Sequence, residues 1–148
     1  MASRKRRAPV RLVTVQRAER VAEGATRVLG SAQAAATLQA LIGDKDREHV
    51  VVLHMDVRHQ ILAAEVVGIG ILTSCLVHPR EVYKAAILLG AAAIIVGHNH
   101  PSGDDDPSKE DDELMKRLGD AGQILGITLL DFIIVTETRH WSASGRLV

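Results

Sequence analysis

The chain gathers most of its reactive side chains in one segment, His98-Asn99-His100-Pro101-Ser102-Gly103-Asp104-Asp105-Asp106-Pro107-Ser108-Lys109-Glu110-Asp111. This segment follows an apolar run, 91–96, and precedes an amphipathic helical pattern. In extended backbone, residues i and i+2 point to the same side, so the imidazoles of His98 and His100 can reach one ion. Open α/β sheets place their sites beyond the carboxyl ends of buried strands. The segment therefore predicts a metal site at such a strand end.

Ser108 and Asp111 support two interpretations. Ser-x-x-Asp at a helix start resembles a capping box, with Ser108 as the N-cap. Asp111 in the first helical turn can also face back toward the loop and join the two histidines as a metal ligand. Three protein ligands that leave a fourth position for water are typical of catalytic zinc sites. Nitrogen and oxygen donors also accept other divalent ions, so zinc is a preference.

A metal-assisted hydrolase also needs a side chain that accepts a proton from water. We expect Glu65 to be this group, because it lies in an apolar strand pattern, where burial of a carboxylate is costly. Glu48 is the rival candidate, but it lies near the polar turn 44–47. A carboxylate on the solvent face of an edge strand remains the structural alternative for Glu65.

Hydrophobic patterning predicts one α/β domain with a single mixed sheet flanked by helices. Strands are predicted at 10–15, 49–55, 60–67, 91–96 and 127–136, with an extended stretch at 72–77 and a closing hairpin formed by 138–142 and 146–148. Helices are predicted from Ser31 to Gly43, from Pro79 to Leu89 and from Ser108 to Leu125. Proline in a first helical turn and glycine after a last one support these helix limits.

Composition limits the compartment and the partners. The chain has 148 residues, and its 18 basic and 18 acidic residues cancel, so net charge gives no preference for nucleic acid. The only cysteine, Cys75, excludes an internal disulfide and agrees with a reducing cytoplasm. No apolar run reaches the roughly 20 residues of a membrane helix, and we expect no signal peptide. Residues 1–9 are expected to form a basic disordered arm capable of weak nucleic-acid contact, with the folded domain at 10–148.

The spacing around the central segment resembles a known motif. His98-x-His100, seven further residues, Ser108, two residues and Asp111, with an upstream glutamate, resembles the JAMM metalloprotease motif of JAB/MPN domains. The longer string His98-Asn99-His100-Pro101-Ser102-Gly103-Asp104, followed by Pro107-Ser108 and Asp111, resembles the RadC branch of that superfamily. The similarity extends over about 10–148 through the following segments: Val77-His78-Pro79-Arg80-Glu81, Leu125-Gly126-Ile127, Leu130-Asp131, and Ser142 with Gly145.

The resemblance implies a zinc-dependent hydrolase with a cytidine deaminase-like fold. It implies His98, His100 and Asp111 as the metal ligands, Glu65 as the acid and base, and Ser108 as a hydrogen-bonding support for developing charge. The implied substrate is a peptide or isopeptide amide.

Two positions depart from the RadC pattern. Asp131-Phe132 stands where RadC-type chains usually have Asp-His, and Gly70-Ile71 stands where they have Gly-Thr. Full-length RadC-type proteins resemble a fusion with an N-terminal helix-hairpin-helix region, and we do not recognise such a region in this sequence. The alternatives to a hydrolase are a DNA-associated accessory protein, with binding through the basic arm, and a metal-binding scaffold without turnover.

Overall fold

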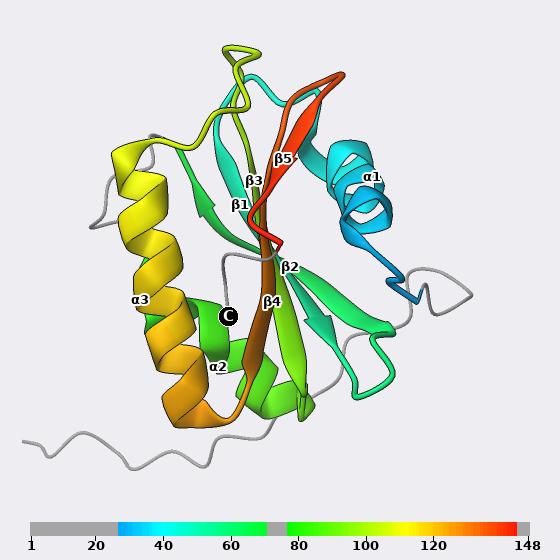
Figure 1. The fold of residues 1–148 in the computed structure, drawn as a ribbon, viewed down its shortest axis with the longest axis vertical. Coiled ribbons are helices and arrows are strands. Elements are labelled where there is room, and N and C mark those ends of the chain that lie inside the picture. The colour runs from blue at the N-terminus through cyan, green and yellow to red at the C-terminus, as the bar shows by residue number, and fades with distance from the viewer. Residues whose placement is uncertain (1–26, 71–76, 145–148) are drawn as a thin grey trace, which may run out of the picture.

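The structure, a computed structural model, describes residues 27–70 and 77–144 of the chain (Figure 1). Within these residues it contains α1 (Ser31–Ile42), β1 (His49–Met55), β2 (Ile61–Ile69), α2 (Pro79–Leu89), β3 (Ala93–Asn99), α3 (Lys109–Leu125), β4 (Thr128–Val135) and β5 (His140–Ser142). None of the helices in the described part is both long and apolar enough to cross a membrane.

The strands form one mixed sheet in the order β2-β1-β3-β4-β5. β3 and β4 are parallel, and the other neighbours are antiparallel. Helix α1 covers one face of this sheet, while α2 and α3 cover the other (Figure 1). The predicted fold class, a single mixed sheet flanked by helices, is therefore confirmed.

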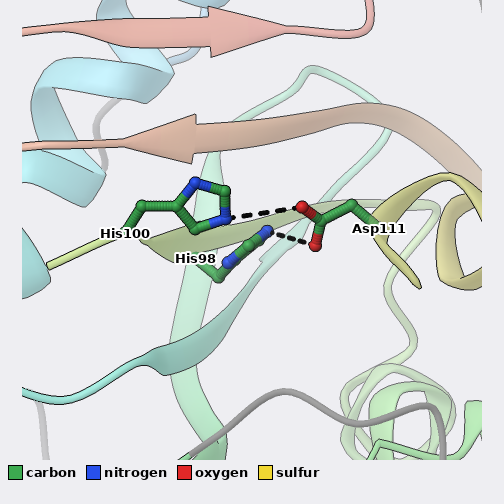
Figure 2. A group of neighbouring side chains, drawn as sticks. All are labelled: His98, His100 and Asp111. Carbon is green, nitrogen blue, oxygen red and sulfur yellow. Dashed lines mark ion pairs between the residues drawn. The ribbon is translucent and has the colours of Figure 1, made fainter. Parts of the chain in front are cut away.

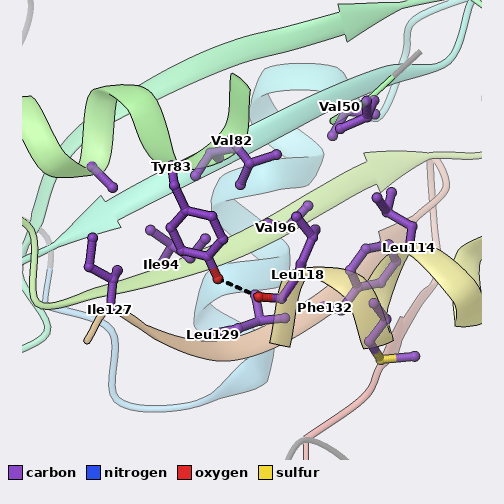
Figure 3. Close-up of a cluster of buried hydrophobic side chains, with 14 of the residues drawn as sticks. Val50, Val82, Tyr83, Ile94, Val96, Leu114, Leu118, Ile127, Leu129 and Phe132 are labelled. Carbon is purple, nitrogen blue, oxygen red and sulfur yellow. Dashed lines mark hydrogen bonds between the residues drawn. The ribbon is translucent and has the colours of Figure 1, made fainter. Parts of the chain in front are cut away.

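Each face of the sheet has its own aliphatic core. Leu38 and Ile42 of α1 pack on one face, and side chains of α2 and α3 pack on the other (Figure 3). The buried Tyr83 on α2 donates its hydroxyl to the carbonyl of Leu118 on α3, at 2.7 Å. Burial raises the pKa of Tyr83 to about 12, so the hydroxyl keeps its proton and the bond between the two helices.

The helix limits follow the predicted signals closely. α2 spans the predicted residues, with Pro79 in its first turn and Gly90 after its last turn in the left-handed conformation (φ 65°). α1 also ends at the predicted glycine, Gly43. α3 begins one residue after Ser108, which acts as its N-cap.

β3, which carries His98, begins and ends later than predicted. Apolar patterning stopped at Val96, whereas β3 continues to Asn99 because β1 and β4 pair with it on both sides. Gly97 permits close packing of α1 at this point: a Cβ there would lie 2.4 Å from Cδ1 of Leu38. The extended backbone therefore delivers His98 to the end of a buried strand.

The remaining strand predictions are correct in type and differ at their ends. β2 runs to Ile69 instead of 67, and β4 is one residue shorter at each end than 127–136. β5 pairs antiparallel with β4. The other half of the closing hairpin (146–148), the arm 1–9, the strand 10–15 and residues 72–76 of the extended stretch lie outside the described residues.

Candidate metal centre

Three side chains converge where β3 ends, and they are the three predicted metal ligands. His98 comes from β3, His100 follows it directly, and Asp111 lies in the first turn of α3. Each offers one ligand atom, and these atoms all lie within 4.8 Å of one another. Nε2 of His98 is 2.8 Å from Oδ1 of Asp111, and Nε2 of His100 is 3.4 Å from Oδ2 (Figure 2).

Backbone and loop contacts set the orientation of His100. Its N–H donates to the carbonyl of Val135 at 3.0 Å, which continues the pairing with β4 beyond the strand. Nδ1 lies 2.7 Å from the carbonyl oxygen of Asp104, so the ring donates from Nδ1 and presents Nε2 to Asp111. The hydrogen bond with Asp111 raises the pKa of His100, against the opposing effect of burial.

Asp111 caps α3 and faces the two histidines, so its geometry is compatible with both roles that the sequence left open. Its Oδ2 accepts from the N–H of Ser108 at 2.8 Å, which completes a capping box, while Oδ1 faces His98. Burial raises the pKa of the Asp111 carboxyl, but the imidazoles of His100 and His98 and the N–H of Ser108 lower it more. The net pKa lies below the ordinary aspartate value. The carboxylate is therefore ionised, as a metal ligand must be.

The donor set fits a divalent cation. His98 is fully buried, and neither of its ring nitrogens has a hydrogen-bond partner among the described residues. A buried polar nitrogen without a hydrogen-bond partner lowers stability. Nε2 of His98 faces Oδ1 of Asp111. A cation shared by the two imidazoles and the carboxylate would satisfy that nitrogen. Two imidazoles and one carboxylate match the His₂-carboxylate sets of catalytic zinc sites.

Ser108 lies at the edge of this centre through its capping role. Its Oγ accepts from the N–H of Asp111 at 3.1 Å. This reciprocal capping box holds Asp111 in place, because each residue satisfies a backbone donor of the other.

Glu65 is not brought into the group of ligand atoms. Its carboxylate lies 3.2 Å from Nε2 of His54. Glu65 and His98 share a sheet face, but they lie on β2 and β3, with β1 between them, opposite Val52 and Val50 respectively. Two strand spacings and a two-residue step put their Cα atoms roughly 12 Å apart.

Three observations relate Glu48 to the centre. Glu48 directly precedes β1 and stands two residues before Val50, the residue that pairs with His98. The charge of Glu48 contributes to the raised pKa of His100. Glu48 also lines a cavity of about 470 Å³, together with Pro101 beside the ligand histidine. These observations make Glu48 a second candidate for the proton-transfer group, and the assignment of Glu65 stays a prediction.

Asn99 anchors the segment that contains Glu48, and sequence reasoning did not identify this asparagine. Its Oδ1 accepts from the N–H of His49 at 2.7 Å, and its Nδ2 donates to the carbonyls of Arg47 (2.9 Å) and Lys45 (3.3 Å). The side chain is buried and fastens the segment before β1 to β3. Its sequence signal was a polar residue between two candidate ligands in a buried strand.

Comparison with known proteins places these observations in a family. The model of the RadC-like JAB domain family matches residues 28–147. The chain belongs to the RadC-like JAB domain family. Residues from Glu48 to Asp111, including all three ligand candidates, lie within the matched part of this JAB domain.

Curated relatives share about half of their aligned residues with this JAB domain. It is 48% identical over 103 residues to the UPF0758 protein of Desulforamulus reducens, covering 70% of this chain and 45% of that protein. It is 46% identical over 99 residues to the UPF0758 protein of Methanosarcina acetivorans, covering 67% and 43%. The chain thus spans less than half the length of these relatives.

One departure from the RadC pattern now has a structural account. Phe132 is fully buried on β4 and packs against His98, with ring centroids 5.5 Å apart and planes at 66°. It forms an apolar wall beside this ligand and does not line the cavity next to Glu48. Ile71, the other departure, lies outside the described residues, as do the basic arm and Cys75.

Proposed function

We propose that this JAB domain is a zinc-dependent hydrolase that cleaves a peptide or isopeptide amide. The observation that carries the proposal is the convergence of His98, His100 and Asp111, with ligand atoms within 4.8 Å of one another. These residues stand at the carboxyl end of a strand in a parallel pair, where α/β folds commonly place catalytic groups.

The three side chains would hold the ion. A bound Zn²⁺ would supply Lewis acidity for the scissile carbonyl and lower the pKa of a water molecule. Asp104 supports His100 through its carbonyl, and Ser108 supports Asp111 through the capping box. Such outer contacts orient ligands and tune their affinity for metal.

Proton transfer in this proposal is assigned to Glu48 in preference to Glu65. The charge of Glu48 acts on His100, and Glu48 lines the neighbouring cavity. These observations support a carboxylate that accepts a proton from water and passes it to the leaving amine. The carboxylate of Glu65 contacts His54, and the Cα atom of Glu65 is roughly 12 Å from that of His98.

Ser108 is proposed to stabilise the oxyanion. A serine hydroxyl accepts and donates at the same time. The Oγ that accepts from the N–H of Asp111 can therefore donate its own hydrogen to negative charge that develops on the carbonyl oxygen.

The experiment that tests this function separates metal binding from turnover. Bound divalent metal is measured in the wild type, and hydrolysis is followed on a panel of peptides and isopeptide-linked conjugates. Glu48→Gln and Glu65→Gln are then compared. Glu113→Gln, which changes an exposed carboxylate on α3, is the matched control.

We expect metal in the wild type and in all three variants, with turnover lowered about 100-fold or more by Glu48→Gln. Glu65→Gln is expected to retain turnover. The opposite result for the two glutamates would restore the assignment made from the sequence. Metal binding without cleavage of any substrate in the panel would favour the metal-binding scaffold. Absence of bound metal would exclude both, and a salt-sensitive DNA complex that is lost when residues 1–9 are deleted would then support the accessory role.

A further inference from the structure

The loop between the histidines and helix α3 is an exposed connection with few ties to the core. Residues 101–107 are mostly exposed. Three hydrogen bonds within the loop or to His100 join residues close in sequence: Gly103 N–H to the His100 carbonyl (3.1 Å), Asp104 N–H to Ser102 Oγ (3.4 Å), and Asp106 N–H to Asp104 Oδ1 (3.0 Å). Such contacts shape a turn without fixing its position relative to the sheet.

Arg139 connects this loop to another part of the fold. Its Nη2 donates to the carbonyl of Gly103 at 2.8 Å and lies 3.4 Å from Oδ1 of Asp105. Gly103 and Asp105 flank Asp104, whose carbonyl accepts from Nδ1 of His100. One guanidinium therefore holds both neighbours of the residue that orients a metal-ligand candidate.

The backbone of Arg139 is itself well anchored. It lies in the hairpin turn between β4 and β5, which stands at the same end of the sheet as the loop (Figure 1). Thr136 donates its N–H to the Arg139 carbonyl at 2.8 Å and accepts the Arg139 N–H on Oγ1 at 2.9 Å. Gln39 on α1 donates from Nε2 to the same carbonyl at 3.2 Å. Helix α1 and the sheet thus fix the point from which the side chain reaches the loop.

We propose that Arg139 is a positioning residue for His100. It holds Gly103 and Asp105 so that the Asp104 carbonyl keeps the imidazole turned toward the metal. The inference rests on the proposed function only in requiring that His98, His100 and Asp111 bind a divalent ion. Outer-shell contacts of this kind typically change metal affinity 10- to 100-fold. Because Arg139 acts one contact further out, we expect about a tenfold effect.

The test uses Co²⁺ as both probe and ligand in the full chain. Co²⁺ affinity is measured by titration, and the visible absorption of the bound ion reports ligand geometry. Arg139→Ala should weaken binding about tenfold and alter the spectrum, whereas Arg139→Lys should fall between it and the wild type because one ammonium replaces the planar fork. Arg80→Ala is the matched control, since Arg80 is an exposed arginine beside an acid on α2.

The unfolding temperature of the metal-free protein separates positioning from general stability. The Arg139 side chain is 60% exposed, so its loss should change that temperature little. If Arg139→Ala lowers the unfolding temperature, Arg139→Lys decides between the two explanations. Weaker Co²⁺ binding by Arg139→Lys at an unchanged unfolding temperature supports the positioning role, and Co²⁺ binding equal to that of the wild type overturns it. Equal affinity and an unchanged spectrum in Arg139→Ala would also overturn the inference while leaving the proposed function intact. A wild type that binds no Co²⁺ or Zn²⁺ would overturn both.

Discussion

The sheet face covered by α2 and α3 carries two histidine–carboxylate groups that differ in their surroundings. At the end of β3, His98 and His100 meet Asp111. Near one edge of the sheet, His54 on β1 meets Glu65 on the edge strand β2, at 3.2 Å. His98 and His54 are both fully buried, and each has a ring nitrogen without a hydrogen-bond partner among the described residues.

The difference lies in the number of donors and in what holds them. The first group has three ligand atoms from two elements, and a carbonyl and a capping serine orient its members. The second is a pair, and no third metal-ligating side chain in the described part of the chain joins it. Catalytic zinc sites have three protein donors, so the first group fits such a site and the His54–Glu65 pair does not.

The largest expected contrast is in metal affinity. His100→Ala removes one of three ligands, so it should weaken Zn²⁺ binding by more than the 10- to 100-fold typical of outer-shell changes. His54→Gln should leave Zn²⁺ affinity unchanged, because His54 belongs to the separate pair. Competition with a chromogenic chelator measures both. Equal losses in the two variants would show that the groups are not independent.

The same contrast should appear in thermal stability. Zn²⁺ at about 100 times its Kd should stabilise the wild type by about 2.7 kcal/mol, since it binds the native state. The gain should persist in Glu65→Gln and disappear in His100→Ala. Thermal unfolding with and without metal gives the comparison. A gain that survives in His100→Ala would place the binding site elsewhere.

A smaller effect concerns pH and the His54–Glu65 pair. Burial lowers the pKa of His54 below its ordinary value of 6.5, although Glu65 opposes this, and Lys84 on α2 faces the same carboxylate. Below pH 6.5 the unfolded chain then binds more protons at this residue than the folded one. Stability should therefore fall as pH drops below 6.5, with a slope of at most about 1.4 kcal/mol per pH unit.

The measurement is the difference in free energy of unfolding between the metal-free wild type and His54→Gln across pH 5 to 8. Taking this difference cancels the contributions of His98 and His100. A difference that grows with rising pH only above 7 would contradict the lowered pKa.

The smallest effect separates the two roles of Asp111. Asp111→Asn keeps a side-chain oxygen that can accept from the N–H of Ser108, so the stability of the metal-free protein should change by less than about 1 kcal/mol. Zn²⁺ affinity should still fall strongly, because the carboxylate charge is lost. Asp111→Ala should cost about 1 kcal/mol more through loss of the cap. Urea unfolding and metal titration of both variants provide the test. Unchanged Zn²⁺ affinity in Asp111→Asn would limit Asp111 to capping.

Much of the fold could be predicted from local patterns. The limits of β1 and α2, the glycine ends of α1 and α3, and Ser108 as an N-cap follow from residue preferences within a few positions along the chain. The grouping of His98 and His100 was predictable because extended backbone places alternate residues on one side. Asp111 was predictable as a partner because its helix begins directly after the same loop.

The positions of the two glutamates depended on contacts between distant parts of the chain. Both stand in or beside strands, and their distance from His98 depends on strand order and register. β1 pairs with β2 through two register shifts, at Val50/Val51 and His54/Met55, which no local pattern indicates. Only the paired sheet shows that Glu65 meets His54 and that Glu48 directly precedes the strand that pairs with β3.

The sequence by itself determined the donor set, the helix that presents Asp111 and the chemistry that these residues allow. The tertiary structure decided the pairing of Glu65 with His54, the anchoring of the segment before β1 by Asn99, and the connection of Arg139 to the His100 loop. The physical reason is separation along the chain. The donors lie within fourteen residues of one another and are placed by backbone geometry. The positions of Glu48, Glu65 and Arg139 relative to the centre depend on strand register and packing, which arise only when the whole sheet forms.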